Sequence, residues 1–297
     1  MPNCNLCQHK CNIDRTKSTG RCRANDTIKI ALSTLHHFEE PCISGTNGSG
    51  TIFFFNCNLS CMYCQNHEIS QTGKGQVYTI EQLAELMLEQ QQNQAENVNL
   101  VTPTIYADKI IEAIKIARRE GLQIPIVYNT STYETVETIQ KLNGYIDVYL
   151  PDLKYYNDEI AKAYSHAGNY FQTAAAAIQE MYKQVGPPVL DNRGMIRKGL
   201  IIRHLVLPNH VADSKKILKW INDTIDQEVY VSVMAQYFPT YLAKDHNKLN
   251  RKLSRQEYEQ IENYLYSLNL DNGYIQELGE HEEEYVPNFN LPIRNNS

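Results

Sequence analysis

The chain has 297 residues, enough for one large domain or for one domain with a small appendage. Hydrophobic residues make up 42% and charged residues 21%, a composition that excludes general disorder. No apolar stretch approaches the roughly 20 residues that a membrane-spanning helix needs. The first residues also lack the apolar segment of a secretory signal. We therefore expect a cytoplasmic protein without a membrane partner.

All eight cysteines lie in the first 64 residues. Thiols stay reduced in the cytosol, so this one-sided placement favours local metal sites over a disulfide framework. The net charge is −6, yet residues 1–25 carry five basic side chains against one acidic one. A basic segment of this kind suits a nucleic acid, an acidic protein partner or simple solvation, of which solvation is favoured. The twenty tyrosines are dispersed, so no nucleic-acid partner is expected.

From residue 51 onward, short β-branched or aromatic runs alternate with longer amphipathic ones. The predicted strands cover 51–55, 98–101, 124–128, 146–150, 200–206 and 229–234, with a short one near Ile275. The predicted helices cover 79–91, 106–120, 132–142, 157–185, 211–224 and 254–268, the first with Thr79 as its N-cap. An acidic tail follows.

Six β units separated by helices indicate an α/β fold with a parallel sheet or barrel. Right-handed crossovers place the carboxyl ends of the strands on one face, where barrel enzymes carry their chemistry. Residues 1–50 lack this alternation and are predicted to form a cysteine-rich N-terminal extension stapled by metal. The expected division is therefore this extension, a core barrel over 51–240, and a C-terminal helix, short strand and acidic tail over 241–297.

Cys57, Cys61 and Cys64 form a C-x3-C-x2-C run directly after the first strand of the barrel. Three thiolates on one loop can hold three irons of a [4Fe–4S] cluster, which leaves the fourth iron open. An open coordination position distinguishes catalytic metal sites from structural ones. Zinc bound by three cysteines is the alternative, but the position after a barrel strand favours catalysis.

This cysteine run, with an aromatic residue before its third cysteine, resembles the signature of the radical SAM superfamily. Its wider context more specifically resembles proteins related to pyruvate formate-lyase activating enzyme, the activases of glycyl-radical enzymes. The residues that carry this second resemblance are Glu39-Glu40-Pro41, Ser44-Gly45, 48–54, 57–66, 147–155, 202–208 and 233–239. The resemblance therefore covers nearly the whole chain.

The resemblance implies a partial (β/α)6, TIM-like barrel with a [4Fe–4S] cluster on the three cysteines and S-adenosylmethionine (SAM) on the fourth iron. One electron from a reductant such as a flavodoxin or ferredoxin then cleaves SAM to a 5′-deoxyadenosyl radical, which abstracts hydrogen from a substrate. That substrate is a glycyl-radical enzyme if the chain is an activase, and another peptide or a small molecule if it is not. A non-catalytic zinc or iron–sulfur protein is the alternative from a different class.

The resemblance also suggests residues that would bind SAM. Tyr63 would lie against the adenine, or else pack within its loop. Thr102 stands where the family has a Gly-Gly-Glu-like motif, so backbone carbonyls would have to receive the methionine amine. Asn129 and Ser131 end the third strand and could hydrogen-bond the ribose.

Charged residues follow the next two strands. Asp152 and Lys154 come after the fourth strand, and Arg203 and His204 lie late in the fifth. A guanidinium suits the methionine carboxylate, because its planar fork matches carboxylate geometry. Adjacent residues of a strand point to opposite faces, so only one of Arg203 and His204 can face the barrel interior. An ion pair with Asp152 is the competing interpretation for Arg203 or Lys154.

The N-terminal extension carries a four-thiol set, C-x2-C-x3-C-x10-C, formed by Cys4, Cys7, Cys11 and Cys22. Four thiolates can close a zinc site or carry a second iron–sulfur cluster, and either would staple a segment too short for its own core. A segment without metal is the third alternative. A second cluster could relay electrons, and the basic segment could then dock an acidic reductant. Cys42 is predicted to be a packed hydrophobic residue rather than a ligand.

Overall fold

The structure is a computed structural model that describes residues 4–72, 75–268, 270–279, 287 and 289. In these ranges the strands form a ten-stranded sheet in the order β10-β9-β8-β6-β5-β4-β2-β1-β3, with β7 paired to β8. The strands are β1 (Ile28–His36), β2 (Ser49–Phe54), β3 (Gln76–Tyr78), β4 (Val98–Val101), β5 (Ile126–Thr130), β6 (Val148–Pro151), β7 (Val189–Leu190), β8 (Ile196–Leu205), β9 (Tyr230–Met234) and β10 (Gly273–Ile275).

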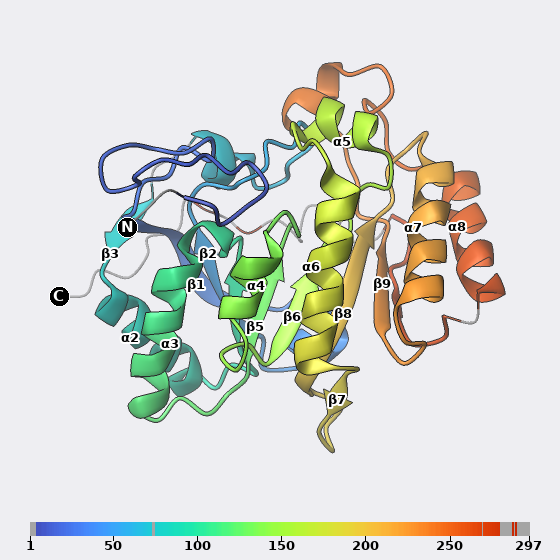
Figure 1. Ribbon diagram of the computed structural model, residues 1–297. Helices are drawn as coiled ribbons and strands as arrows, with labels where there is room; N and C mark the ends of the chain where they lie inside the picture. Colours follow the sequence, from blue (N-terminus) through green and yellow to red (C-terminus); the bar gives the residue numbers. More distant parts are fainter. Residues whose placement is uncertain (1–3, 73–74, 269, 280–286, 288, 290–297) are drawn as a thin grey trace.

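Helices cover the outer face of this sheet, except for the short α1 (Pro41–Ser44), which packs on residues of the barrel interior (Figure 1). The other helices are α2 (Ile80–Gln92), α3 (Ala107–Arg119), α4 (Val136–Lys141), α5 (Asp158–Ser165), α6 (Tyr170–Val185), α7 (Val211–Thr224) and α8 (Arg255–Ser267). Seven strands from β2 to β10 run parallel, while β1 pairs antiparallel with β2 and with β3. Because β3 and β10 end the sheet and do not pair, the barrel is open, which confirms the predicted partial barrel.

The helix boundaries follow from local capping chemistry. Thr79 caps α2 as predicted, in a capping box with Gln82. The single helix predicted over 157–185 is instead two helices, because His166 and Asn169 take left-handed backbone angles that end α5 and start α6. The carboxylate of Asp158 accepts the backbone N–H groups of Asn169 and Tyr170 at 2.9 Å each, which fixes this break.

The prediction that residues 1–50 carry no strand is wrong for β1. Ile28, Ile30 and Leu32 are buried, and β1 pairs along most of its length with β2. The alternation expected of a strand was hidden because Ala31 is buried between Ile30 and Leu32 at an irregularity in the pairing. The strand-free extension therefore ends before Ile28, and the sheet begins there.

Two apolar clusters position the site. The larger lies between the sheet and its helices, and the smaller fills the barrel interior. In the interior, Cys42 and Ile43 of α1 pack on Val127, Val148 and Ile201, so Cys42 is a packed hydrophobic residue as predicted. α1 therefore closes one end of the barrel and leaves the end with the strand carboxyl termini open. No helix in the described ranges is long and apolar enough to cross a membrane. Residues 280–286 of the predicted acidic tail lie outside the described residues.

Candidate active site

The three cysteines of the C-x3-C-x2-C run lie on the loop that follows β2, and all three line one cleft of about 740 Å³. This volume lies within the range of small-molecule sites, roughly 300–1,000 Å³. Neighbouring elements hold the loop in place. The backbone N–H groups of Ser60 and Met62 donate to the carbonyls of Ser165 and Tyr164 in the last turn of α5, and the N–H of Ala243 donates to the Met62 carbonyl.

Each of the three thiols has a polar partner. The Ser165 hydroxyl donates to Sγ of Cys61 at 2.9 Å, and the backbone N–H of Leu59 donates to Sγ of Cys57 at 3.3 Å. Sγ of Cys64 lies 3.3 Å from the Ser70 hydroxyl. Hydrogen bonds of this kind stabilise thiolates and tune the potential of a cluster that they hold. The arrangement therefore fits a group bound through three sulfur atoms.

Burial raises the pKa of all three thiols, that of Cys64 to about 11, and Lys154 acts in the opposite direction on each. The sulfur atoms must lose protons to bind a metal, so loading them is coupled to proton release. No three His, Cys, Asp or Glu side chains of the described residues lie close enough together to hold a single metal ion. Each thiolate around a [4Fe–4S] cube binds a different iron, so the three sulfur atoms need not converge on one ion.

Arg203 links the charged strand ends at the centre of the cleft. Its guanidinium donates to Asp152 at 2.8 Å, to Glu39 at 3.0 Å and to the side-chain oxygen of Asn129 at 2.6 Å. Lys154 donates to the second oxygen of Asp152 at 2.7 Å. The competing interpretation, an ion pair between Arg203 or Lys154 and Asp152, is therefore present in the structure. Arg203 has three protein acceptors, which leaves Lys154 the less committed cation.

Of the residues predicted to bind SAM, all except His204 line the cleft. Tyr63, Thr102, Asn129 and Ser131 line the cleft, as do Asp152, Lys154 and Arg203. Tyr63 is nearly buried and its hydroxyl lies 2.5 Å from that of Tyr155, so the ring forms a fixed wall. Thr102 has a φ of 60°, a left-handed angle that is costly for a β-branched residue and is found mostly at functional sites.

His204 does not reach the cleft, which corrects its prediction as a residue that binds SAM. Its two ring nitrogens lie 2.7 Å from the Leu153 carbonyl and 2.8 Å from the hydroxyl of Ser214 on α7. The alternation of β8 therefore points Arg203 inward and His204 toward the helices. His204 is a structural residue that fastens β8 to α7.

His204 makes stability depend on pH. Burial lowers its pKa from 6.5 to about 4, so the unfolded chain takes up a proton between these values and the folded chain does not. The free energy of unfolding should therefore fall on acidification, by about 2 kcal/mol from this residue at pH 5. In the His204→Gln variant this part of the pH dependence should be missing. Urea denaturation of both proteins at pH 7.5 and pH 5 measures it, and equal pH dependences would contradict the assignment.

The structure adds cleft residues that the sequence analysis did not assign. Glu39 and Glu40 follow β1, line the cleft beside Arg203, and were noticed only as part of the family resemblance. Ser70 and Ser165 contact the thiols from segments outside the cysteine run. Two adjacent glutamates before a proline are easy to recognise in the sequence. Their proximity to β8 could not be predicted, because the two segments are far apart in the chain.

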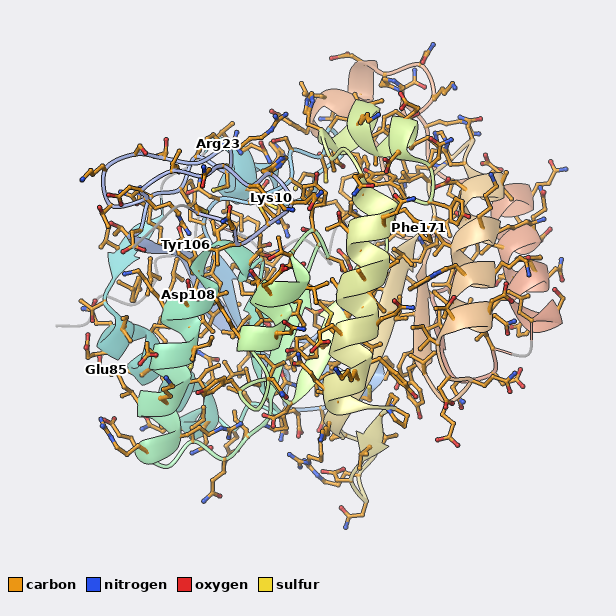
Figure 2. All side chains as sticks on the ribbon, viewed as in Figure 1. Lys10, Arg23, Glu85, Tyr106, Asp108 and Phe171 are labelled. Atoms are coloured by element: carbon orange, nitrogen blue, oxygen red, sulfur yellow. The ribbon has the colours of Figure 1, made fainter. Side chains whose placement is uncertain are left out.

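The four-cysteine segment lies over the carboxyl ends of the first strands, as the positions of Lys10 and Arg23 show (Figure 2). Its backbone pairs with the turn after β5, where the N–H of Gln8 donates to Tyr133. A ring nitrogen of His9 lies 2.8 Å from the carbonyl of Asn58, the residue next to Cys57. The segment therefore contacts the cysteine loop directly.

The four thiols of this segment lie near one another. The backbone N–H of Arg21 donates to Sγ of Cys11 at 3.3 Å, and a β-carbon on Gly20 would lie 3.4–3.5 Å from Sγ of both Cys22 and Cys11. Burial, together with the charges of the other three cysteines, raises the pKa of Cys7 to about 12. These contacts place Cys11 and Cys22 close together, with Cys4 and Cys7 near enough to act on one another electrostatically.

Comparison with known proteins defines the class of the chain. The radical SAM superfamily profile matches residues 51–221, more than half of the chain, and the chain belongs to this superfamily. It is an enzyme of the radical SAM class, and this class uses a [4Fe–4S] cluster and SAM. The protein MJ0674 of Methanocaldococcus jannaschii is 32% identical over 280 residues, which cover 91% of this chain and 76% of that protein.

Solved structures show the same fold at low sequence identity. Streptococcus suis SuiB, bound to its precursor peptide SuiA, matches with a TM-score of 0.52 and 14% identity over 77% of this chain. The hydrogenase maturase HydG of Carboxydothermus hydrogenoformans matches with a TM-score of 0.51 and 16% identity over 78% of this chain. The chain spans about half the length of these proteins, 48% of SuiB and 54% of HydG.

Proposed function

We propose that this enzyme cleaves SAM reductively at a cluster held by Cys57, Cys61 and Cys64 and removes a hydrogen atom from a substrate in the adjoining cleft. The observation that supports this most strongly is the cleft itself, which joins three thiols with hydrogen-bond partners to the charged strand ends. When bound, the cluster and SAM supply the electron transfer and the radical chemistry. The protein has to bind and orient SAM and the substrate, and it has to exclude water from the cleft.

The residues of the cleft suit these tasks. Lys154 is the cation best placed to receive the methionine carboxylate, because its only acceptor among the described residues is Asp152. Asp152 and Glu39 line the same cleft as Thr102, where this chain lacks the glutamate of the family motif, and could offer a carboxylate to the methionine amine. Tyr63, fixed by Tyr155, provides an apolar wall that keeps water out.

A substrate that enters the cleft fits this geometry better than a glycyl-radical partner does. An activase should need no deep substrate pocket, because it acts on the backbone of a large protein. Here the cleft continues past the cysteines to polar side chains inside the barrel, among them Glu40, Ser232 and Tyr274. We therefore place a small molecule, or a side chain of a peptide, ahead of a glycyl-radical enzyme as the substrate.

The test is an anaerobic assay of the reconstituted protein with dithionite and SAM. We expect iron and sulfide in the ratio of a [4Fe–4S] cluster and steady formation of 5′-deoxyadenosine. If zinc alone is bound after careful reconstitution and no nucleoside forms, the proposal is wrong.

We further propose that Cys4, Cys7, Cys11 and Cys22 hold a second iron–sulfur cluster that passes electrons to the first. The contact between His9 and Asn58 supports this, because it joins the segment to the loop of Cys57. We expect about eight irons in the wild-type protein and about four in the Cys7→Ser variant. Four irons with one zinc in the wild type would instead make the segment a structural zinc site.

The basic face of the same segment is proposed to dock an acidic reductant such as a flavodoxin or ferredoxin. Lys10, Lys17 and Arg21 are exposed and suit this role. Arg15 does not, since its guanidinium donates to the carbonyls of Ile105 and Asn25 within the fold. Replacing the three exposed residues by serine should lower turnover with a flavodoxin, most at low salt, and leave dithionite-driven turnover unchanged.

A further inference from the structure

The cleft contains more negative than positive charge. Among the described residues that line it, the acids are Glu39, Glu40, Asp152 and Glu277, whereas the bases other than two histidines, His36 and His37, are Lys154 and Arg203. The cofactors do not correct this excess. A cluster held by three thiolates is anionic overall and SAM is cationic overall, so the two together leave the balance of the cleft unchanged. Something else with a positive charge would complete the site.

Two of the four acids, Glu40 and Glu277, make no hydrogen bond to Arg203 or Lys154, and Glu40 is the buried one of the two. Arg203 and Lys154 are committed to Asp152 and Glu39 by contacts of 2.7–3.0 Å. Glu40 is 7% exposed, and its Oε2 has no hydrogen-bond partner among the described residues. A buried carboxylate oxygen without a partner is costly, so such groups usually mark a binding or catalytic function.

The backbone fixes this carboxylate in place. The carbonyl of Glu40 accepts the N–H groups of Ile43 at 2.7 Å and Ser44 at 3.0 Å in the first turn of α1. α1 closes the barrel below, so the Glu40 side chain belongs to the floor of the cleft. Burial raises the pKa of Glu40, while the charge of Arg203 and, less strongly, the Ser232 hydroxyl on β9 lower it.

Aromatic side chains also line this cleft. Phe38, Phe53 and Tyr274 line the same cleft as Glu40. Aromatic faces accommodate alkyl chains and also attract cations. The combination suits a positively charged group at the end of an apolar stem.

We propose that the substrate carries an ammonium or guanidinium group on an apolar stem, and that Glu40, supported by Glu39, binds this group at the floor of the cleft. The proposal rests on the proposed function, because it names the substrate class of the same site. The group could belong to a free amino acid or amine, or to a lysine or arginine side chain of a peptide. These substrates share a cationic group, which would form an ion pair and hydrogen bonds with the carboxylate of Glu40.

Calorimetry on the reconstituted holoenzyme with SAM tests the proposal. The probes are butylammonium and butylguanidinium, with 1-pentanol as a neutral probe of similar size. We expect the cations to bind about tenfold or more tightly than the alcohol, and Glu40→Gln to weaken cation binding about 30-fold. L-lysine and a pentapeptide with a central lysine then distinguish a free substrate from a peptide side chain by which of them binds more tightly.

Two further variants keep this experiment decisive. Glu85→Gln removes an exposed carboxylate on α2 (Figure 2) that does not line the cleft, and should bind the cations as the wild type does. Glu40→Asp keeps the charge and carries the test if Glu40→Gln loses iron or unfolds. It should retain selectivity for the cations over 1-pentanol, with weaker binding.

The proposal is overturned if no cation binds the wild type, if 1-pentanol binds as tightly, or if Glu40→Gln binds the cations like the wild type. Formation of 5′-deoxyadenosine in the same preparation separates the two proposals. Cation binding without nucleoside would leave the Glu40 site standing and reject the proposed function. Nucleoside formation without cation binding would support the proposed function and reject the Glu40 site.

Discussion

Replacing Cys61 by alanine is expected to reduce 5′-deoxyadenosine formation to the background of the assay. Two thiolates remain on the loop, and the cluster needs three to leave only one iron open. The Ser165 hydroxyl, which donates to Cys61 at 2.9 Å, would lose its acceptor but stay buried. The measurement combines nucleoside yield, iron content and the electron paramagnetic resonance signal of the reduced protein.

Cys42→Ala provides the matched control for this result. Cys42 is as buried as a cysteine of the loop, yet it packs on apolar residues inside the barrel. Its removal should cost about 1 kcal/mol of unfolding free energy and leave iron content and nucleoside yield intact. If Cys61→Ala still forms nucleoside while Cys42→Ala does not, the ligands have been assigned to the wrong cysteines.

The parts of the fold that depend on local pattern could be predicted from the sequence. The six predicted barrel strands (β2, β4, β5, β6, β8 and β9) have the alternation or apolar runs that the sheet requires. Thr79 caps α2 because its hydroxyl reaches the N–H of Gln82. β1 was missed because an irregular pairing buries consecutive residues. The break between α5 and α6 was missed because it depends on the left-handed angles of His166 and Asn169.

The candidate site likewise has a part that local sequence pattern predicts and a part that it does not. The loop of Cys57, Cys61 and Cys64 is contiguous, so its spacing alone indicated a metal site. The alternation of a strand predicted that Arg203 and His204 point apart, but which of them faces inward depends on the twist and register of β8, which pair it with β6 and β9. Glu39 is 164 positions from Arg203 in the chain, and no local rule connects residues at that separation.

Arg203→Met is expected to lower the free energy of unfolding by about 3–5 kcal/mol, because it leaves buried carboxylates without their cation. The guanidinium of Arg203 bridges Asp152, Glu39 and Asn129 at 2.6–3.0 Å. Arg203→Lys should recover only part of the loss, since an ammonium cannot match a planar fork to three acceptors. Urea denaturation of the three proteins measures the difference, and a loss below about 1 kcal/mol in Arg203→Met would contradict this account.

The pH dependence of the same variant gives an independent test, because its sign is fixed by which carboxylate loses its partner. In the wild type, Arg203 and Lys154 hold the pKa of Asp152 below 3.8, whereas burial raises that of Glu39 above 4.5 despite Arg203. Without the guanidinium, Glu39 should take up a proton more readily when folded than when unfolded. The unfolding free energy of Arg203→Met should therefore decrease, relative to the wild type, as the pH rises from 4.5 toward neutrality. A variant whose stability follows the pH dependence of the wild type would show that Glu39 and Asp152 do not depend on Arg203.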